Sequence, residues 1–535
     1  MESDRELTSN NLPLAGKTAF VTGGNRDIGA GTIRALARLG ISRVGSIHRD
    51  ERKAKREPDV VNYAAAHGTD VKFTLGDITT PEGIQTIANM TNTELGGNLD
   101  ILVLNTSGQG RDVNVVAANA IVDALLPKMN PGGTIMFRQS VPGHYYEELR
   151  QQGREGEIPE FYRGIAEVKG EGEKTLRARI PEFNAKGIRF LVDCPPEVAG
   201  TGNIRLFTRF DRSFSEKHRA LLASLGLPHI IPIEAVAHVS SQMLANSNLP
   251  TGYIELYRET RDVRGPLSRF YTDRTTYADQ VNDRYNFATF TVPETHTDRS
   301  NEPANIEAIE FTQEGAVATT HITKAHAKDH FRDEVGLNPL PLHKQVRTVV
   351  EVAGAIVNNG SDSPKRVRLS SFDGIQCMGA IIPGTTMETR ITVTDRNDTS
   401  MTFDVQISRD GKPVTSMQQV TCIVEDAPSL EQELREKFLL EDQIIETAAQ
   451  MAGMLSWNAN QGQDFSPLFL SVGSGRFFER AKAGDILTGL INTRPTRRGS
   501  DSDVLMITDG RELADIRRIN SIVVRTNVVR RILGI

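Results

Sequence analysis

The sequence has few cysteines: Cys194, Cys377 and Cys422 are the only three among 535 residues, and they lie far apart. This spacing does not match a disulfide framework or a cysteine metal site, so we expect three buried free thiols. The sequence also lacks an apolar run near the ~20 residues that a membrane span needs, and its polar start has no signal-peptide core. These absences predict a cytoplasmic protein that does not enter a membrane.

An excess of positive charge is also missing. The formal net charge is −6 and there is no clustered basic face, so a nucleic-acid partner is not expected. The composition is that of an ordinary globular protein, with 38% apolar and 24% charged residues. A chain of this length exceeds the size of one hydrophobic core, and we expect roughly three domains.

Residues 18–31, TAFVTGGNRDIGAG, have the pattern of a strand, a glycine turn and a helix. An apolar run enters a turn that contains Gly23, Gly24 and Gly29, and a helical pattern follows over Ile33–Leu39. In such a unit the glycines let the backbone approach a pyrophosphate, and the first turn of the helix offers it unpaired N–H groups. The pattern predicts a dinucleotide site, although a purely structural turn can use the same glycines.

The end of the second predicted strand favours a phosphorylated cofactor. That strand, Ser42–Ile47, is followed by His48, Arg49 and Asp50. A bare ribose 2′-hydroxyl usually meets an acidic side chain here, whereas a 2′-phosphate is bound by arginine. Arg49, together with Arg26 in the glycine turn, therefore predicts NADPH rather than NADH.

The segment over about residues 14–258 resembles the short-chain dehydrogenase/reductase family. The matches, in order, are the glycine turn, an acidic residue after the third strand, Asn-Thr-Ser-Gly after the fourth, a strand at Gly132–Phe137 that leads to a serine, and a closing strand at Leu249–Ile254. The resemblance implies an α/β Rossmann-type fold with a doubly wound parallel sheet. It also implies that the cofactor is bound by Gly23, Asn25, Arg26, Ile28, Gly29, Arg49, Asp77, Ile78, Asn105 and Lys169.

The same resemblance implies that Ser140, Tyr162 and Lys169 are catalytic. Counting back from Gly187 in the family's register places the lysine at Lys169, but Ile165 then occupies the usual tyrosine position and cannot donate a proton. Tyr162 stands one helical turn earlier, and this Tyr-x6-Lys spacing resembles the enoyl-acyl-carrier-protein reductase branch. In either branch the tyrosine hydroxyl protonates or polarises a developing oxyanion, while the lysine lowers the tyrosine pKa. Alternatively, Tyr162 is one of several loop aromatics and the domain is inactive.

The chain divides according to these patterns. Residues 1–13 are a polar tail and residues 14–258 are the first domain. Residues 259–305 are polar and have no steady apolar period, which predicts a linker. Two repeats are expected to follow it, at 306–427 and 428–535.

The two repeats share a helical pattern followed by several strands. Both carry an Asp-Gly turn between their last two strands, at Asp410 and Asp509. One helix wrapped by a curved antiparallel sheet, twice, is therefore the expected α+β architecture. The second repeat lacks the leading strands that the first has at Ile306–Phe311 and Ala316–Ile322, so we expect it to be truncated.

This pattern resembles a double hot-dog fold, in particular the 3-hydroxyacyl-acyl-carrier-protein dehydratases. His330-Phe331 resembles the family's His-Phe motif, and Glu446 with Gln450 resembles its Glu-x-x-x-Gln helix, whereas Arg347 stands in the position of Glu446 in the first repeat. The resemblance implies one catalytic pair, His330 from the first repeat and Glu446 from the second. Dehydration of a 3-hydroxyacyl thioester needs a base for the C2 proton and an acid for the departing hydroxyl, and these residue types supply both.

Other interpretations of these residues stay open. His330 lies near His321, His326 and His343 in the sequence, and any of these is equally consistent with a surface or loop histidine. Glu446 is likewise consistent with an exposed helix residue. The usual Pro-Gly turn before the helix is also replaced in the second repeat.

Together the two resemblances imply a bifunctional acyl-thioester enzyme of fatty acid or polyketide type metabolism. NADPH-dependent reduction of a 3-oxoacyl or 2-enoyl thioester would be coupled to 3-hydroxyacyl dehydration. The substrate would be carried on acyl carrier protein or coenzyme A, by a homo-oligomer without a metal. The alternatives are a degenerate acyl-binding scaffold or partner protein, a dehydratase with an inactive reductase domain, and a thioesterase.

Overall fold

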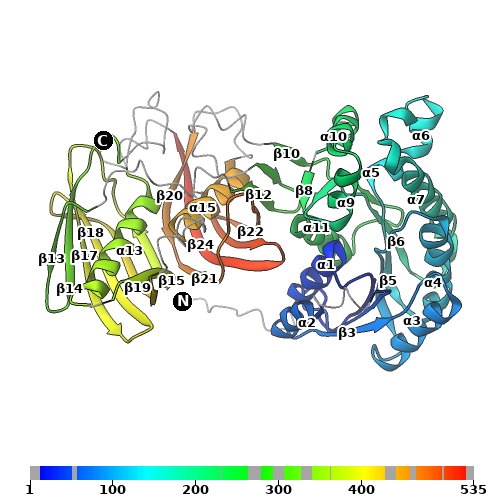
Figure 1. Ribbon diagram of the computed structural model, residues 1–535, viewed down its shortest axis with the longest axis horizontal. Coiled ribbons are helices and arrows are strands. Elements are labelled where there is room, and N and C mark those ends of the chain that lie inside the picture. Colours follow the sequence, from blue (N-terminus) through cyan, green and yellow to red (C-terminus); the bar gives the residue numbers. More distant parts are fainter. Residues whose placement is uncertain are drawn as a thin grey trace. The chain divides into compact units, whose positions relative to one another are not determined.

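The computed structural model of the chain describes residues 12–50, 57–228, 230–262, 279–292, 306–326, 340–361, 363–427, 441–457, 465–496 and 499–525. The chain divides into two compact units, Met1–Thr260 and Arg261–Ile535, whose residues can be followed by colour along the sequence in Figure 1. The three cysteines are free thiols, as predicted, and two of them, Cys194 and Cys422, are buried. Among the described residues, no helix is both long and apolar enough to cross a membrane.

The first unit is built around a seven-stranded sheet whose described pairings are parallel. The strand order is β3-β2-β1-β4-β5-β6-β9, so the direction of winding reverses between β1 and β4. This is the doubly wound sheet predicted from the sequence. Its strands are β1 (Thr18–Thr22), β2 (Arg43–His48), β3 (Asp70–Leu75), β4 (Leu99–Leu104), β5 (Met129–Arg138), β6 (Arg189–Asp193) and β9 (Ile254–Glu255).

Helices bury this sheet. All five residues of β1 are buried, as in a parallel strand that is covered on both faces. β7 (Glu197–Ala199) and β8 (Ile230–Pro232) pair in a separate two-stranded parallel ribbon. Two of the helices lie between these strands in the sequence. The α-helices are α1 (Asp27–Arg38), α2 (Glu57–Ala66), α3 (Pro81–Thr93), α4 (Ala118–Leu125), α5 (Val141–His144), α6 (Tyr146–Gln151), α7 (Glu160–Ala178), α8 (Ile180–Ala185), α9 (Gly202–Phe210), α10 (Phe214–Ser224) and α11 (Ile233–Ala245).

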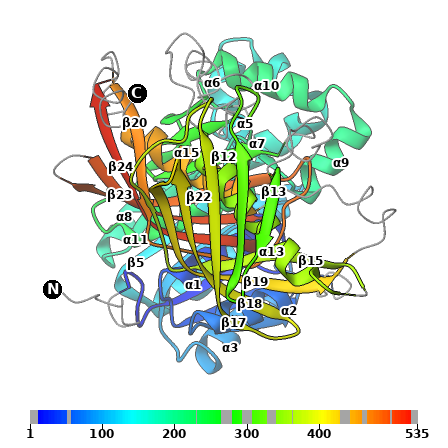
Figure 2. The same ribbon diagram turned by 90° about the vertical axis from the view of Figure 1, so that its left-hand side faces the viewer.

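The second unit is mostly antiparallel sheet. Two helices, α13 (Leu342–Asn358) and α15 (Glu441–Trp457), pack on it and on each other. The long strands β17, β18 and β19 lie side by side next to α13 (Figure 2). The strands are β10 (Thr260–Asp262), β11 (Gln280–Asn282), β12 (Phe287–Thr291), β13 (Ala308–Phe311), β14 (Gly315–His321), β15 (Lys365–Phe372), β16 (Gly374–Cys377), β17 (Thr386–Arg396), β18 (Ser400–Arg409), β19 (Lys412–Asp426), β20 (Phe465–Val472), β21 (Ser474–Phe477), β22 (Ile486–Thr496), β23 (Gly499–Thr508) and β24 (Arg511–Arg525).

The second unit contains the same arrangement twice, as the sequence predicts. The helices α13 and α15 begin at Leu342 and Glu441, and each precedes five strands of matching length, β15–β19 and β20–β24. Both long hairpins turn at an aspartate with positive φ, 49° at Asp410 and 46° at Asp509. We call the elements built around α13 the first half and those built around α15 the second half.

The predicted linker and the predicted truncation need correction. Within residues 259–305, β11 and β12 form a hairpin, and β12 pairs with β22 of the second half. In the first half, the hairpin β13–β14 pairs with β17 in the same way. The second half therefore has its leading strands, but they precede the first half in the chain. The two strands contain only three and five residues, which is too short to give a clear alternating pattern.

We expect Phe290→Ala to destabilise the second unit, because the Phe290 ring lies in β12 and is fully buried. Loss of a buried phenylalanine ring typically costs about 3–5 kcal/mol of unfolding free energy. Phe311→Ala in β13 is the matched control, since that ring is 45% exposed and its loss should cost less than about 0.5 kcal/mol. Urea unfolding of the full chain measures both, and equal effects would contradict a core role for β12.

Candidate functional site

The turn after β1 forms a tight backbone cradle. A Cβ atom on Gly29 would lie 2.2 Å from the carbonyl oxygen of Gly23, so only glycine fits there. Gly23 itself has a φ of 66°, which favours glycine. Arg26, the N-cap residue of α1, makes no side-chain capping bond to the helix. The cradle and the uncapped first turn of α1 fit the pyrophosphate of a dinucleotide.

Arg49 and Asp77 meet at the ends of β2 and β3. Arg49 Nη1 lies 3.5 Å from Asp77 Oδ2, and hydrogen bonds from Thr79 hold the pKa of Asp77 below its usual value. The Arg49 side chain is 73% exposed, and that of Arg26 is 43% exposed. Two accessible guanidinium groups at this edge of the sheet fit a ribose 2′-phosphate. Ile78, the next residue after Asp77, is buried.

Asn105 fastens the end of β4 to the end of β1. Its backbone N–H donates to Thr22 Oγ1 at 2.9 Å, and its side-chain amide donates to the Thr22 carbonyl oxygen at 3.1 Å. The Thr106 N–H donates to the same hydroxyl at 2.9 Å. The winding of the sheet reverses between these two strands, where sheets of this kind bind their ligands. The structure therefore brings the predicted cofactor residues to one edge.

Helix α7 carries Tyr162 and Lys169. Their spacing corresponds to about two helical turns, so both lie on one face of the helix. Ile165, at the position where the family resemblance places the tyrosine, lies between them and is buried beside Phe207 as a packing residue. Burial raises the pKa of Tyr162, and the nearby Ser140 side chain opposes this shift. The predicted residues Ser140 and Tyr162 therefore lie near each other.

Lys169 is buried at the end of β5. Its Nζ atom donates to the carbonyl oxygen of Arg138 at 3.0 Å, and the side chain is 4% exposed. Burial lowers the pKa of Lys169 to about 8, and Cys194 and Glu173 oppose this shift. A lysine with a pKa near neutrality changes its protonation state easily, which suits a role in proton transfer.

A buried polar cluster around Glu173 was missed from the sequence. The Glu173 carboxylate accepts hydrogen bonds from Gln139 at 2.9 Å and Arg177 at 2.7 Å, and it lies 3.0 Å from His144 Nδ1. Gln139 also donates to the Lys169 carbonyl oxygen at 2.9 Å. These contacts fix α7 against the end of β5, next to Ser140. The spacing of four residues from Lys169 to Glu173 and from Glu173 to Arg177 is the sequence signal for this cluster.

In the second unit, Glu446 lies where α15 packs against α13. Glu446 Oε2 is 3.6 Å from Nδ1 of His343 on α13, and its Oε1 accepts a hydrogen bond from Gln450 at 2.8 Å. All three side chains are buried. The interpretations of His343 as a surface or loop residue and of Glu446 as an exposed one are therefore wrong.

His330 and Phe331 lie outside the described residues, so the pairing of His330 with Glu446 stays a prediction. Arg347, which matches Glu446 in the first half, is buried one helical turn from His343. An imidazole and a guanidinium on α13 thus accompany a carboxylate on α15. The four-residue spacing of His343 and Arg347 was the available sequence signal, because it places both on one helix face.

Comparisons with known proteins concern the first unit. The family model for short chain dehydrogenases matches residues 17–151. The hydroxynaphthalene reductase arp2 of Aspergillus fumigatus is 30% identical over 193 residues, which cover 32% of this chain and 67% of the relative. Among solved structures, a blue fluorescent protein from a metagenomic library, in complex with NADPH, is 22% identical, with 45% of this chain and 96% of that chain covered and a TM-score of 0.37. A short-chain dehydrogenase/reductase from Serratia marcescens is 21% identical over the same shares, with a TM-score of 0.34.

The lowered pKa of Lys169 predicts how the stability of the first unit depends on pH. Below about pH 8 the ammonium is protonated in the folded and the unfolded chain, and its burial costs free energy. Between about pH 8 and 10.5 the unfolded chain binds more protons at this residue, so the free energy of unfolding rises with pH. The total rise is on the order of 3 kcal/mol, at ~1.4 kcal/mol per pKa unit.

Lys169→Met removes this titration, and Lys174→Met, at an exposed position of the same helix, is the matched control. Over this pH range we expect wild type and Lys174→Met to gain stability relative to Lys169→Met. Urea unfolding of the full chain, followed by the circular dichroism of its helices, measures the difference. Parallel pH profiles for wild type and Lys169→Met would contradict the lowered pKa.

Proposed function

The chain belongs to the short-chain dehydrogenase family, and from this premise we propose that its first unit reduces a 3-oxoacyl or 2-enoyl thioester with NADPH. The observation that carries the proposal is that Tyr162, with the Ser140 side chain near enough to lower the pKa of its hydroxyl, lies on the helix that also holds the buried Lys169. A proton donor and an orienting hydroxyl are thus present although the usual tyrosine position holds Ile165. The acyl group would be carried on acyl carrier protein or coenzyme A, by a homo-oligomer.

NADPH is the cofactor that the edge of the sheet fits. The Gly23–Gly29 cradle would hold the pyrophosphate, while Arg26 and Arg49 would hold the 2′-phosphate. Asn105 and Lys169 would lie toward the nicotinamide end, as the family resemblance implies. When bound, NADPH supplies the hydride for the reduction.

The side chains of the site would handle the proton. The raised pKa of Tyr162 keeps its hydroxyl protonated near neutral pH, so it can donate to the oxyanion that forms on the substrate. Ser140 orients that hydroxyl and offers a second hydrogen bond to the same oxygen. Lys169, with its lowered pKa, would help to restore the tyrosine proton.

We expect Tyr162→Phe to lower kcat by at least about 100-fold, the usual contribution of a positioned general acid, without weakening NADPH binding. Oxidation of NADPH with short 3-oxoacyl and 2-enoyl thioesters, assayed in parallel, measures the effect and identifies the substrate. Tyr146→Phe, which removes another hydroxyl from the neighbouring aromatic group, is the matched control and should keep most of the activity. Similar losses in both variants, or no turnover of either thioester, would contradict the proposal.

We further propose that the second unit is a double hot-dog hydro-lyase acting on the 3-hydroxyacyl thioester. What supports this is the buried contact between Glu446 and His343, in a unit that carries one helix on antiparallel strands twice. A carboxylate and an imidazole on facing helices can take the C2 proton and protonate the departing hydroxyl. The Gln450 amide would hold the carboxylate in place.

Glu446→Gln keeps the side-chain volume and removes the charge, so we expect it to lower hydration of a short 2-enoyl coenzyme A thioester by at least about 100-fold. NADPH oxidation by the first unit should be unchanged in this variant. Glu351→Gln, on the exposed side of α13, is the matched control and should hydrate normally. Unchanged hydration by Glu446→Gln would contradict the assignment, and release of free thiol would indicate a thioesterase instead.

A further inference from the structure

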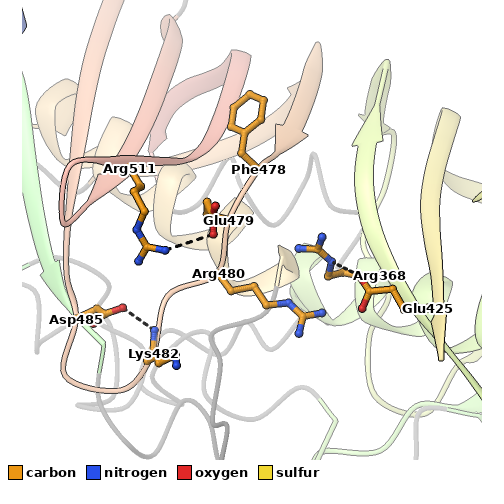
Figure 3. A pocket seen from close by; sticks show the side chains of 8 residues that line it. All are labelled: Arg368, Glu425, Phe478, Glu479, Arg480, Lys482, Asp485 and Arg511. Carbon is orange, nitrogen blue, oxygen red and sulfur yellow. Dashed lines mark hydrogen bonds and ion pairs between the residues drawn. The ribbon is translucent and has the colours of Figure 1, made fainter. Parts of the chain in front are cut away.

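A pocket of about 590 Å³ opens in the second unit between its two halves. The first half contributes Arg368 from β15 and Glu425 from β19, and the second half contributes the connection from β21 to β22 and the start of β24. Figure 3 shows Arg480 extending from that connection toward Arg368 and Glu425. The pocket is therefore formed only when the two halves are folded together.

The lining of the pocket is charged, with four cationic and three anionic side chains. Two carboxylates lie beside arginines: Glu479 is 3.4 Å from Arg511, and Glu425 is 3.6 Å from Arg368. The third carboxylate, on Asp485, accepts a hydrogen bond from the backbone N–H of Lys482. Each of the three carboxylates that line the pocket thus has an ion-pair or hydrogen-bond partner in its wall.

Arg480 has both cationic and anionic neighbours. Burial lowers the pKa of its guanidinium, and Arg366 and Arg368 lower it further, while Glu441 and Glu425 oppose the shift. Nearby cations that disfavour the charged form attract an anion to the same place. Arg368, with a side chain that is 15% exposed, contributes a second partly buried guanidinium.

Three of the four cationic positions are apolar in the other half, while Arg511 corresponds to Lys412. With β17 aligned on β22, Arg480 and Lys482 correspond to Ala380 and Ile382, and Arg368 corresponds to Leu468 when β15 is aligned on β20. The two halves share their fold, so the fold itself does not require a cationic pocket. The charges therefore indicate a binding role that only one of the two equivalent places has acquired.

We propose that this pocket binds the phosphate groups of a nucleotide, with Arg368, Arg480 and Lys482 as the phosphate ligands. Guanidinium groups bind phosphate oxygens in a bidentate manner, and Phe478, which is 48% exposed, offers an aromatic face to an adjoining base. Together with the proposed function, on which this step rests, a phosphate site here makes a coenzyme A thioester the form of substrate that the second unit takes. Arg368 also lies 3.9 Å from Glu441, which begins the helix that carries Glu446.

Isothermal titration of the full chain tests the proposal, with the first unit saturated by NADPH so that its own nucleotide site is filled. The probes are adenosine 3′,5′-bisphosphate, inorganic pyrophosphate and adenosine. We expect the bisphosphate to bind, adenosine not to bind, and Arg480→Gln to weaken the bisphosphate by at least about tenfold, the effect of one lost charge-assisted contact. Arg494→Gln, which removes a 54% exposed arginine of β22, is the matched control and should bind as the wild type does.

The comparison of the probes distinguishes a site for a nucleotide from a site for phosphate groups alone. Equal binding of pyrophosphate and bisphosphate, both weakened by Arg480→Gln, would assign the site to phosphate groups alone, whereas stronger binding of the bisphosphate assigns it to the nucleotide. Absence of binding, or binding that Arg480→Gln leaves unchanged, would overturn the proposal.

A kinetic comparison keeps this result separate from the proposed hydration. Arg480→Gln should raise the KM for an enoyl coenzyme A thioester and leave the KM for the corresponding enoyl pantetheine thioester unchanged. If neither thioester is hydrated while the bisphosphate still binds, the proposed activity fails and the phosphate site stands. If both thioesters are hydrated equally well by wild type and variant, the phosphate site fails and the activity stands.

Discussion

The placement of helix α7 in the first unit depends on Lys169, which has lost almost all contact with water. Moving an ammonium group into a protein interior costs several kcal/mol unless polar partners replace its hydration, so Lys169 can occupy only a narrow range of positions. The Arg138 carbonyl oxygen is such a partner at the end of β5, and Cys194 and Glu173 favour the charged ammonium electrostatically. With α7 held at this point, the residue two turns earlier, Tyr162, lies near the Ser140 side chain. Ile165, one turn earlier, packs beside Phe207 instead.

Much of the first unit could be predicted because its signals are local. Parallel strands buried on both faces are continuous apolar runs, and the turn between β1 and α1 requires glycine at Gly29 through a contact with Gly23. The strands β11 and β12 could not be predicted in the same way, because β22, with which β12 pairs, lies far along the chain and the sequence around the hairpin is polar. His343 was misjudged for a related reason, since its burial depends on a helix of the other half.

The duplicated half shows which features the fold requires. The last strand of each half has a residue with positive φ, Gln419 or Arg518, whose backbone N–H donates to an aspartate of the preceding strand. Both halves have this backbone feature because it shapes the hairpin. The side chains on the facing helices do not shape the hairpin and can differ, and Arg347 and Glu446 occupy matching positions with opposite charge. The leading hairpin of the second half precedes the first half in the chain. The pairing of β12 with β22 therefore links segments that are separated by the whole of the first half.

The pocket brings like charges together in a partly desolvated space, where repulsion is stronger than at the open surface. Arg366 and Arg368 disfavour the charged form of Arg480, and Glu441 and Glu425 offset part of this repulsion. The apolar residue Ala380 in the matching position shows that the same backbone is built without this conflict. A bound anion would remove the repulsion, and it would stabilise the second unit by an amount that grows with the logarithm of its concentration above Kd. Like charges held close together in an otherwise stable fold are thus a physical reason to expect a ligand, independent of any resemblance to known enzymes.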